Sequence, residues 1–211
     1  MKTQYKEFGY ADADPLDCGT YVFPAVLDLG LSLGPTPRVL DVGCGNGALA
    51  GQFVEHGCEV VGIDLSEEGI ALARSAYPDA RFEIAEADEH VLETLDEQPF
   101  DLVVSTEVVE HVYAPSAFAA GCFSALRPGG RFVLSTPYHG YLKNLAIAAR
   151  GKFDSHVHPL VQGGHIKFWS RDTMHELLQQ AGFVNFQFEG VGRVPYLWKS
   201  MVCAGDRPRT R

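Results

Sequence analysis

Short apolar runs alternate with longer amphipathic segments along the chain from Arg38 onward. The short runs are rich in β-branched residues, which predicts buried strands, whereas the longer segments have the spacing of helices with one apolar face. This alternation is typical of a parallel sheet with helices on both of its faces. We therefore predict a doubly wound, Rossmann-like α/β fold.

The predicted parallel strands span residues 38–42, 59–63, 81–85, 100–105 and 131–136. The predicted helices between them span 47–56, 67–76, 90–95 and 115–126. A turn over Leu126–Gly130 is expected to end the last of these helices, because its Pro-Gly-Gly sequence does not continue a helix. Further along, a helix is predicted over 171–181 and strands over 183–189 and 196–204. These two strands are close enough in sequence to pair as an antiparallel hairpin at the sheet edge.

The length of the chain, residues 1–211, fits a single domain. Residues 1–37 are interpreted as an N-terminal cap, in which 18–34 form one or two helices over the site. Residues 38–137 are interpreted as the cofactor-binding core, and 138–170 as a long, histidine-rich excursion on the substrate side. Residues 171–206 complete the domain with a helix and a hairpin. Loops as long as the excursion usually carry function.

The composition is that of an ordinary globular protein, with 46% hydrophobic and 21% charged residues. No apolar run reaches the ~20 residues that cross a bilayer, and Met1–Asp17 are polar and acidic where a signal peptide needs an apolar stretch. The five cysteines are scattered, which argues against a disulfide framework and a zinc-thiolate site. We therefore expect a cytoplasmic protein.

Acidic side chains outnumber basic ones by 27 to 17, and the formal net charge is -10. Such a surface repels the phosphate backbone of nucleic acids. The charge therefore disfavours a nucleic-acid partner and favours a small-molecule acceptor.

A glycine-rich turn joins the first predicted strand to the first helix within Val39–Gly47 (VLDVGCGNG). Glycines without a Cβ let the backbone approach a ligand, and the following helix offers free N–H groups to an anion. Asp41 lies within the strand, and Asp64 lies 19 residues beyond Gly45, close to the ~20-residue spacing at which a carboxylate reaches a ribose. The turn alone also fits the glycine spacing of nicotinamide-dependent dehydrogenases.

Together with Leu126–Phe132 (LRPGGRF), these residues resemble class I S-adenosylmethionine-dependent methyltransferases over roughly residues 38–137. The resemblance implies that the glycine turn accepts the methionine part of S-adenosyl-L-methionine and that Asp64 binds both ribose hydroxyls. It implies an adenine contact within residues 86–88, where either acidic residue is eligible. The cofactor residues expected on this basis are Asp41, Gly43, Cys44, Gly45, Asn46, Gly47, Asp64, Leu65, Glu86, Ala87, Asp88, Thr106 and Glu107.

A charged cluster follows the fourth predicted strand, in the sequence TEVVEH. If this segment starts a helical turn, Glu107, Glu110 and His111 occupy positions i, i+3 and i+4 and project from one face. Two carboxylates and an imidazole at this spacing suit a divalent cation. The histidine-rich excursion returns to the same sheet edge, and His165 is the fourth ligand that we select from it.

The pattern Glu-x-x-Glu-His, with a later His before Lys, Phe and Trp, resembles two groups of methyltransferases. One comprises the catechol O-methyltransferases of ubiquinone biosynthesis, and the other methylates the 3′-terminal 2′-hydroxyl of small RNAs. In the RNA group, two Glu and two His hold a metal that chelates the terminal diol. This resemblance implies a divalent cation (Mg, Mn or Zn) and the candidate ligands Glu107, Glu110, His111 and His165, with His156 and His158 in reserve. Many class I methyltransferases carry a Glu-His pair here without a metal, so both interpretations stay open.

The predicted function is S-adenosylmethionine-dependent O-methylation of a small catechol or diol-like metabolite, with or without a metal. The predicted catalytic residues are His111, Glu110 and His165: a metal would lower the pKa of the acceptor hydroxyl, and without one an imidazole acts as general base. RNA 2′-O-methylation is the main alternative. A nicotinamide-dependent oxidoreductase and a non-catalytic cofactor-binding protein are the alternatives from other classes.

The segment Tyr141–Phe153 is compatible with a helix and combines apolar residues with three cations. It is interpreted first as a lid packed on its own domain. A peripheral contact with an anionic membrane is the second interpretation.

Overall fold

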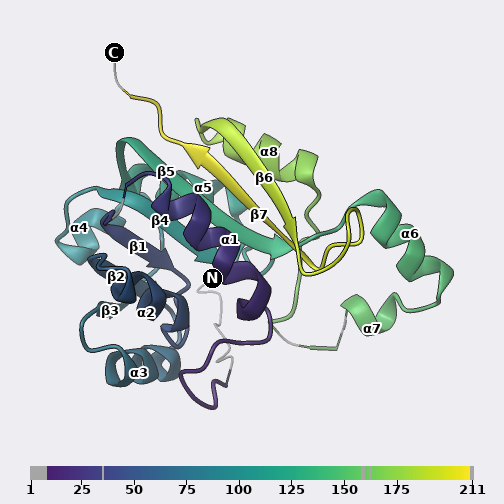
Figure 1. Cartoon of the computed structure of the whole chain (residues 1–211), viewed down its shortest axis with the longest axis horizontal. Helices are drawn as coiled ribbons and strands as arrows, with labels where there is room; N and C mark the ends of the chain where they lie inside the picture. Colours follow the sequence, from purple (N-terminus) through teal and green to yellow (C-terminus); the bar gives the residue numbers. More distant parts are fainter. Residues whose placement is uncertain (1–8, 35, 158–159, 162, 210–211) are drawn as a thin grey trace.

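The structure is a computed structural model of the chain that describes residues 9–34, 36–157, 160–161 and 163–209. The strands of these residues form one seven-stranded sheet in the order β3-β2-β1-β4-β5-β7-β6 (Figure 1). The parallel strands are β1 (Val39–Val42), β2 (Val60–Asp64), β3 (Arg81–Ile84), β4 (Phe100–Thr106) and β5 (Leu126–Pro137). The antiparallel strands are β7 (Ser200–Asp206), which pairs with β5, and the outer β6 (Val184–Val191). The predicted α/β fold with an antiparallel C-terminal hairpin is confirmed.

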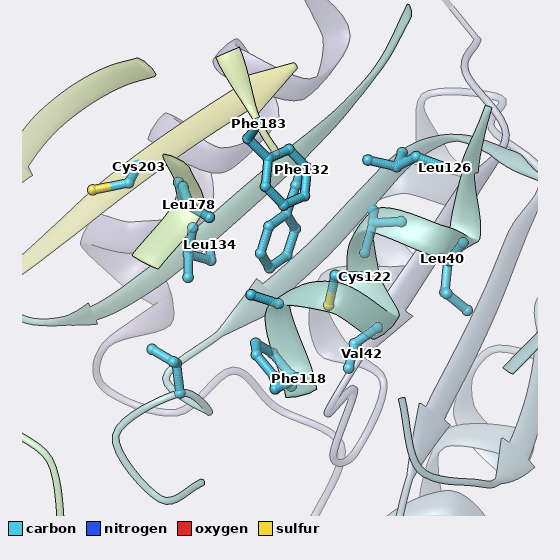
Figure 2. Packing of buried hydrophobic residues seen from close by; sticks show 14 of the residues in the cluster. Leu40, Val42, Phe118, Cys122, Leu126, Phe132, Leu134, Leu178, Phe183 and Cys203 are labelled. Atoms are coloured by element: carbon cyan, nitrogen blue, oxygen red, sulfur yellow. The ribbon is translucent and has the colours of Figure 1, made fainter. Parts of the chain in front are cut away.

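Helices cover both faces of this sheet. One face carries α1 (Gly19–Leu31), α2 (Ala48–Glu55) and α3 (Glu67–Ala76), and the other carries α4 (Val91–Leu95), α5 (Pro115–Ala125) and α8 (Arg171–Gln180). Side chains alternate between the faces along each strand, so Phe132 and Leu134 of β5 pack with the second group while Val133 packs with the first. Figure 2 shows Phe132 and Leu134 near Cys122 of α5 and Phe183.

The two remaining helices, α6 (Tyr141–Ala149) and α7 (Asp154–Val157), belong to the excursion and extend beyond the end of the sheet (Figure 1). The excursion begins and ends beside β5. Tyr138 forms a β-bridge with Trp169, and the His139 N–H donates to the Trp169 carbonyl at 2.9 Å. These contacts bring both ends of the excursion to the carboxyl ends of the parallel strands.

Local side-chain contacts fix where the helices next to the strand ends begin. The Ser66 hydroxyl accepts a hydrogen bond from the Gly69 N–H at the start of α3, and Ser170 and Thr173 form a capping box at the start of α8. Caps of this kind satisfy backbone N–H groups that have no partner within the helix. Ser66 therefore also fixes the chain just after β2.

Some boundaries differ from those predicted. The turn predicted over Leu126–Gly130 lies within β5: Leu126 pairs with Phe100 and regular pairing resumes at Arg131, so the Pro-Gly-Gly residues form an irregularity in the strand. The last strand begins at Ser200 instead of residue 196, because residues 192–199 form the connection from β6. The segment 18–34, expected to hold one or two helices, contains the single helix α1 (Gly19–Leu31), which packs on β5 and β7. None of the helices described has the length and apolar character needed to cross a bilayer.

Candidate active site

The glycine turn after β1 has a backbone that requires glycine. Gly43 has a φ of 74° and Gly45 a φ of 53°, in the left-handed region that residues with a Cβ rarely adopt. A Cβ on Gly43 would lie 2.4 Å from Cγ2 of Val108, and a Cβ on Gly45 would lie 2.3 Å from the hydroxyl oxygen of Tyr10. The predicted turn is therefore enclosed by neighbouring side chains, and Gly47 ends it as the N-cap of α2.

Asp64, at the end of β2, is hydrogen-bonded to this turn. Its Oδ2 accepts from the Gly45 N–H at 2.9 Å, and its Oδ1 accepts from the Ser66 N–H at 2.8 Å. Leu65 follows it and Ile84 pairs with it across the sheet, and both expose apolar side chains. A carboxylate with apolar surface beside it suits a sugar with an attached base.

Asp41 lies within β1 and is completely buried. Among the described residues, neither of its carboxylate oxygens has a hydrogen-bond partner. Burial, and then the neighbouring Asp64 carboxylate, raise the pKa of Asp41 to about 7. An unpaired buried carboxylate is costly, and a cationic ligand group would offset that cost. Together, the enclosed glycine turn, Asp64 and Asp41 fit S-adenosylmethionine, which carries an ammonium on its amino-acid end and hydroxyls on its ribose.

Residues 86–88, expected near the adenine, follow β3. The Asp88 carboxylate accepts from the His90 N–H at 2.8 Å and so stabilises the next turn. Ala87 packs on α5, where its carbonyl oxygen would lie 2.6 Å from a Cβ on Gly121. Glu86 is exposed. The sequence left Glu86 and Asp88 as the two eligible acidic residues. Among the described contacts, the Asp88 carboxylate stabilises the turn and the Glu86 carboxylate does not.

Asn46 and Cys44 complete the turn, and the Cys44 thiol donates to the Gly45 carbonyl with a sulfur–oxygen distance of 4.0 Å. The Asn46 amide donates to the carbonyls of Asp12 and Asp14, both at 2.9 Å, and its oxygen accepts from the Ala48 N–H at 3.4 Å. Cys44 is buried, and burial raises the pKa of its thiol well above the ordinary value. In this structure Asn46, expected to be a cofactor residue, therefore binds the N-terminal segment.

The helical turn considered for TEVVEH does not form. Thr106 ends β4, and Glu107 has a φ of 54°, which turns the chain away from a right-handed helix. The Ser135 hydroxyl donates to the Glu107 carboxylate at 2.8 Å. Burial raises the pKa of Glu107 to about 7, against the lowering effects of Ser135, Ser200 and Lys143. Glu107 thus faces β5 and the start of β7.

Glu110, His111 and His165 meet at the strand ends, with one potential ligand atom from each within 4.8 Å of the others. Oε1 of Glu110 lies 4.0 Å from Nε2 of His111 and 3.9 Å from Nε2 of His165. The two imidazole rings contact each other edge to face, with centroids 4.9 Å apart. Within the described residues, Glu107 does not belong to this group, so the structure brings together three of the four expected metal ligands.

Glu110 is held at both its backbone and its side chain. Its carbonyl accepts from the N–H groups of Ile166 and Lys167, at 2.9 and 3.0 Å, and this contact places His165. Oε2 accepts from the Thr136 hydroxyl at 2.9 Å, while Oε1 has no hydrogen-bond partner in the part of the chain that is described. Burial, and then the Glu107 carboxylate, raise the pKa of Glu110 well above its ordinary value.

The His111 ring is fixed by the returning excursion. Its Nδ1 lies 2.8 Å from the Gly163 carbonyl oxygen. Because a carbonyl only accepts, Nδ1 carries the hydrogen and Nε2 presents its lone pair toward Glu110 and His165. The arrangement can therefore accept a proton or bind a cation.

The other described histidines of the excursion, His139 and His156, are not part of this group. His139 contacts the rings of His156 and Phe168, with centroids 5.5 and 4.9 Å away, and burial lowers the pKa of His139 to about 4. His156 is absent from the group of potential ligands. His158 lies outside the described residues.

Sequence reasoning missed Lys143 as a buried residue. Only 7% of its surface is exposed, and its ammonium donates to the Lys199 carbonyl at 2.9 Å. Burial, and then nearby Arg193, lower the pKa of Lys143 to about 8, against the raising effect of Glu107. A lysine on a helix is usually exposed to solvent, so the burial of Lys143 could not be recognised from the sequence. The buried hydroxyls of Ser135, Thr136 and Ser200 were also missed, although their polar side chains within apolar strands are a usable signal.

Comparison with known proteins shows similarity to methyltransferases, both in a family model and in individual relatives. A family model described as a methyltransferase domain matches residues 18–187. The ubiquinone biosynthesis O-methyltransferase of Cereibacter sphaeroides is 33% identical over 203 residues, covering 90% of this chain and 79% of that protein. The enzyme of the same name from Roseobacter denitrificans is 36% identical over 178 residues, covering 80% of this chain and 68% of that protein.

The chain is also similar in structure to solved methyltransferases. An S-adenosylmethionine-dependent methyltransferase from Mesorhizobium loti superposes with a TM-score of 0.64 and 26% identity, covering 87% of this chain and 96% of that one. Magnesium protoporphyrin IX methyltransferase from Synechocystis, solved with bound S-adenosylhomocysteine, has a TM-score of 0.63 and covers 88% of this chain and 81% of that one. At 20% identity, the second likeness is one of fold.

Proposed function

The chain belongs to the methyltransferase-domain family, and from that premise we propose that it transfers the methyl group of S-adenosylmethionine to an oxygen of a small catechol or diol-like metabolite. The observation that carries the proposal is the group Glu110, His111 and His165 at the strand ends beside the glycine turn. The name of the ubiquinone biosynthesis O-methyltransferases supports an oxygen as acceptor. Family membership sets aside the nicotinamide-dependent oxidoreductase.

The donor half of the site is assigned to the glycine turn, Asp41 and Asp64. When bound, S-adenosylmethionine supplies a methyl group on a positively charged sulfur. Asp64 is fixed by two backbone N–H groups and so presents its carboxylate in one orientation. The buried charge of Asp41 favours a ligand that carries a cation.

The acceptor half is assigned to His111 with Glu110 and His165. Nε2 of His111 accepts the proton of the acceptor hydroxyl, because Nδ1 already carries a hydrogen that is donated to Gly163. The resulting imidazolium is stabilised by the Glu110 carboxylate, whose Oε1 lies 4.0 Å from that nitrogen. Holding the acceptor in line with the methyl group supplies a further part of the rate.

The finer form of this proposal adds a divalent cation held by Glu110, His111 and His165. The three donor atoms lie within 4.8 Å of one another, and the Glu110 oxygen among them has no hydrogen bond within the described part of the chain. When bound, such a cation lowers the pKa of the acceptor hydroxyl. Of Mg, Mn and Zn, two imidazoles and one carboxylate favour Zn.

One experiment tests the function in two steps. Calorimetry with S-adenosylhomocysteine tests the donor half, and absence of binding would contradict the proposal. Transfer of labelled methyl from S-adenosylmethionine is then measured with a catechol, with an RNA ending in a vicinal diol, and with a monohydroxylated control. Preference for the RNA supports the alternative acceptor, which the net charge of -10 disfavours. Loss of transfer after chelation, and its return with added Zn²⁺, supports the cation, whereas an unchanged rate supports His111 as a base on its own.

The exposed side of the excursion supports a further proposal, peripheral contact with an anionic membrane. Leu142, Leu145 and Phe153 are each at least half exposed. The exposed cations Arg150 and Lys152 lie between α6 and α7. Lys143, which the sequence suggested as a third cation, is buried and takes no part. We expect the protein to sediment with phosphatidylglycerol vesicles, to stay in solution with phosphatidylcholine vesicles, and to lose vesicle binding in Leu142→Glu/Leu145→Glu. Equal recovery with both vesicle types would contradict the contact.

A further inference from the structure

The strap, which we define as residues 9–17, crosses the glycine turn before α1 begins. Its Tyr10 hydroxyl lies directly over Gly45, where a Cβ would be 2.3 Å away. The strap also lines most of a cavity of about 580 Å³, whose remaining wall consists of Cys18, Tyr21 and Asn46. This volume lies within the range of small-molecule sites, about 300–1,000 Å³. The strap therefore forms a wall over the turn assigned to the donor.

The side chain of Asn46 connects the turn to the strap. Both hydrogen bonds of its amide nitrogen go to strap carbonyls, those of Asp12 and Asp14, at 2.9 Å each. Its amide oxygen accepts from the Ala48 N–H at the start of α2, and the side chain is 5% exposed. Both N–H groups and the oxygen of this buried amide thus have partners within the chain.

Tyr77 supplies a second connection to the same stretch of the strap. Its hydroxyl donates to the Ala13 carbonyl at 3.2 Å. Its ring packs so closely on α2 that a Cβ on Gly51 would lie 2.2 Å from Cε1. Three successive strap carbonyls, those of residues 12, 13 and 14, are thus held by two side chains of the core.

We propose that Asn46 and Tyr77 are positioning residues that latch the strap over the donor site and so slow the release of S-adenosylmethionine and S-adenosylhomocysteine. The proposal rests on the proposed function only in placing the donor at the glycine turn. Because the latch binds strap carbonyls, it is independent of the strap side chains at these positions. A ligand held at the turn and covered by the strap leaves once the strap has moved, and moving the strap breaks these hydrogen bonds.

Two substitutions remove these hydrogen bonds while they keep the size and shape of the side chain nearly unchanged. Asn46→Asp keeps the oxygen that accepts from the Ala48 N–H but places a second oxygen against the two strap carbonyls. Tyr77→Phe removes only the hydroxyl that reaches Ala13 and keeps the ring on α2. Tyr196→Phe is the matched control, because Tyr196 is 60% exposed and lies in the connection between β6 and β7.

Two measurements report whether the hydrogen bonds of Asn46 and Tyr77 hold the strap in place. The first is the dissociation rate of labelled S-adenosylhomocysteine after a chase with unlabelled ligand. The second is the rate at which endoproteinase Asp-N cleaves the ligand-free protein within the strap, at Asp12, Asp14 or Asp17. We expect dissociation about tenfold faster in Asn46→Asp and about threefold faster in Tyr77→Phe, in proportion to the hydrogen bonds lost. Strap cleavage increases in the same order, and the control matches wild type in both.

The outcomes separate the latch from other roles. Unchanged dissociation and unchanged strap cleavage in both variants, at wild-type melting temperature, would overturn the proposal. So would weaker ligand binding in Asn46→Asp without faster strap cleavage, because that result makes Asn46 a direct donor ligand. If Asn46→Asp does not fold, Tyr77→Phe decides alone. Failure of the wild-type protein to bind S-adenosylhomocysteine counts against the proposed function, while cleavage of the ligand-free variants still tests the latch.

Discussion

The donor half and the acceptor half of the site lie at the same sheet edge but are held together differently. The donor half uses backbone N–H groups of one turn and one loop, as where Asp64 accepts from Gly45 and Ser66. In the acceptor half, Thr136 of β5 donates its hydroxyl to the side chain of Glu110, which lies in the segment after β4. His111 is hydrogen-bonded to the carbonyl of Gly163, 52 residues away. Local sequence therefore specifies the donor half, whereas the acceptor half depends on how the excursion returns to the sheet. The acceptor half can thus change while the cofactor turn stays the same.

The largest expected effect separates the two halves through Glu110. Glu110→Ala removes the carboxylate that faces both imidazoles, so we expect turnover to fall about 10²–10⁴-fold while the affinity for S-adenosylhomocysteine stays within about twofold. Steady-state kinetics and calorimetry on the same preparation measure both quantities. Thr136→Val is the matched milder change, because it removes only the hydroxyl on Oε2 and is expected to lower turnover about tenfold. Loss of donor affinity in Glu110→Ala would show that the halves are not separable.

The converse change acts on Asp64. Asp64→Ala removes two charge-assisted hydrogen bonds, each of about 1.5–3 kcal/mol, and the group assigned to the ribose. We expect calorimetry to show about 100-fold weaker binding of S-adenosylhomocysteine. Saturating donor should restore a large part of the turnover, since the acceptor half is untouched. Turnover that stays low at saturating donor would mean that Asp64 also supports the acceptor half.

The same division explains what the sequence could predict. The alternation of strands and helices and the glycine turn depend on local preferences, and both the fold and the turn were predicted. The helical spacing considered for Glu107 is not observed: its backbone is left-handed and its N–H donates to the Ser135 hydroxyl, a contact that spacing along the chain does not reveal. Asn46 was assigned to the cofactor by its place in the motif, whereas its partners lie more than 30 residues away. The fold and the turn could therefore be predicted from local sequence, whereas contacts with distant partners could not.

A substitution of Asp41 tests whether the donor half keeps a buried charge that destabilises the fold because this charge helps to bind the ligand. Its pKa rises from 3.8 to about 7 on burial, so its contribution to stability is full below pH 3.8 and is lost as the pH rises toward 7. Asp41→Asn removes this dependence, and we expect the ligand-free variant to be about 1–2 kcal/mol more stable at pH 7, after the cost of a buried amide. Urea unfolding from pH 4 to 8 measures the difference. Binding of S-adenosylhomocysteine should weaken in the same variant, and a gain in both stability and affinity would contradict the assigned role.

Lys143 on α6 gives the corresponding test for the excursion, with the smallest expected effect. Burial lowers its pKa from 10.5 to about 8, so its contribution to stability is full above pH 10.5 and is lost as the pH falls to 8. At pH 7 the folded protein therefore carries a buried ammonium that has left water, offset in part by the bond to the Lys199 carbonyl and by Glu107. Lys143→Met keeps the volume and removes the charge, and we expect it to be about 1 kcal/mol more stable at pH 7. Because wild type recovers stability as Lys143 loses its proton, the advantage of the variant should shrink between pH 8 and 10.5 in urea unfolding. An advantage that stays constant over this range would place the ammonium in water, away from the Lys199 carbonyl.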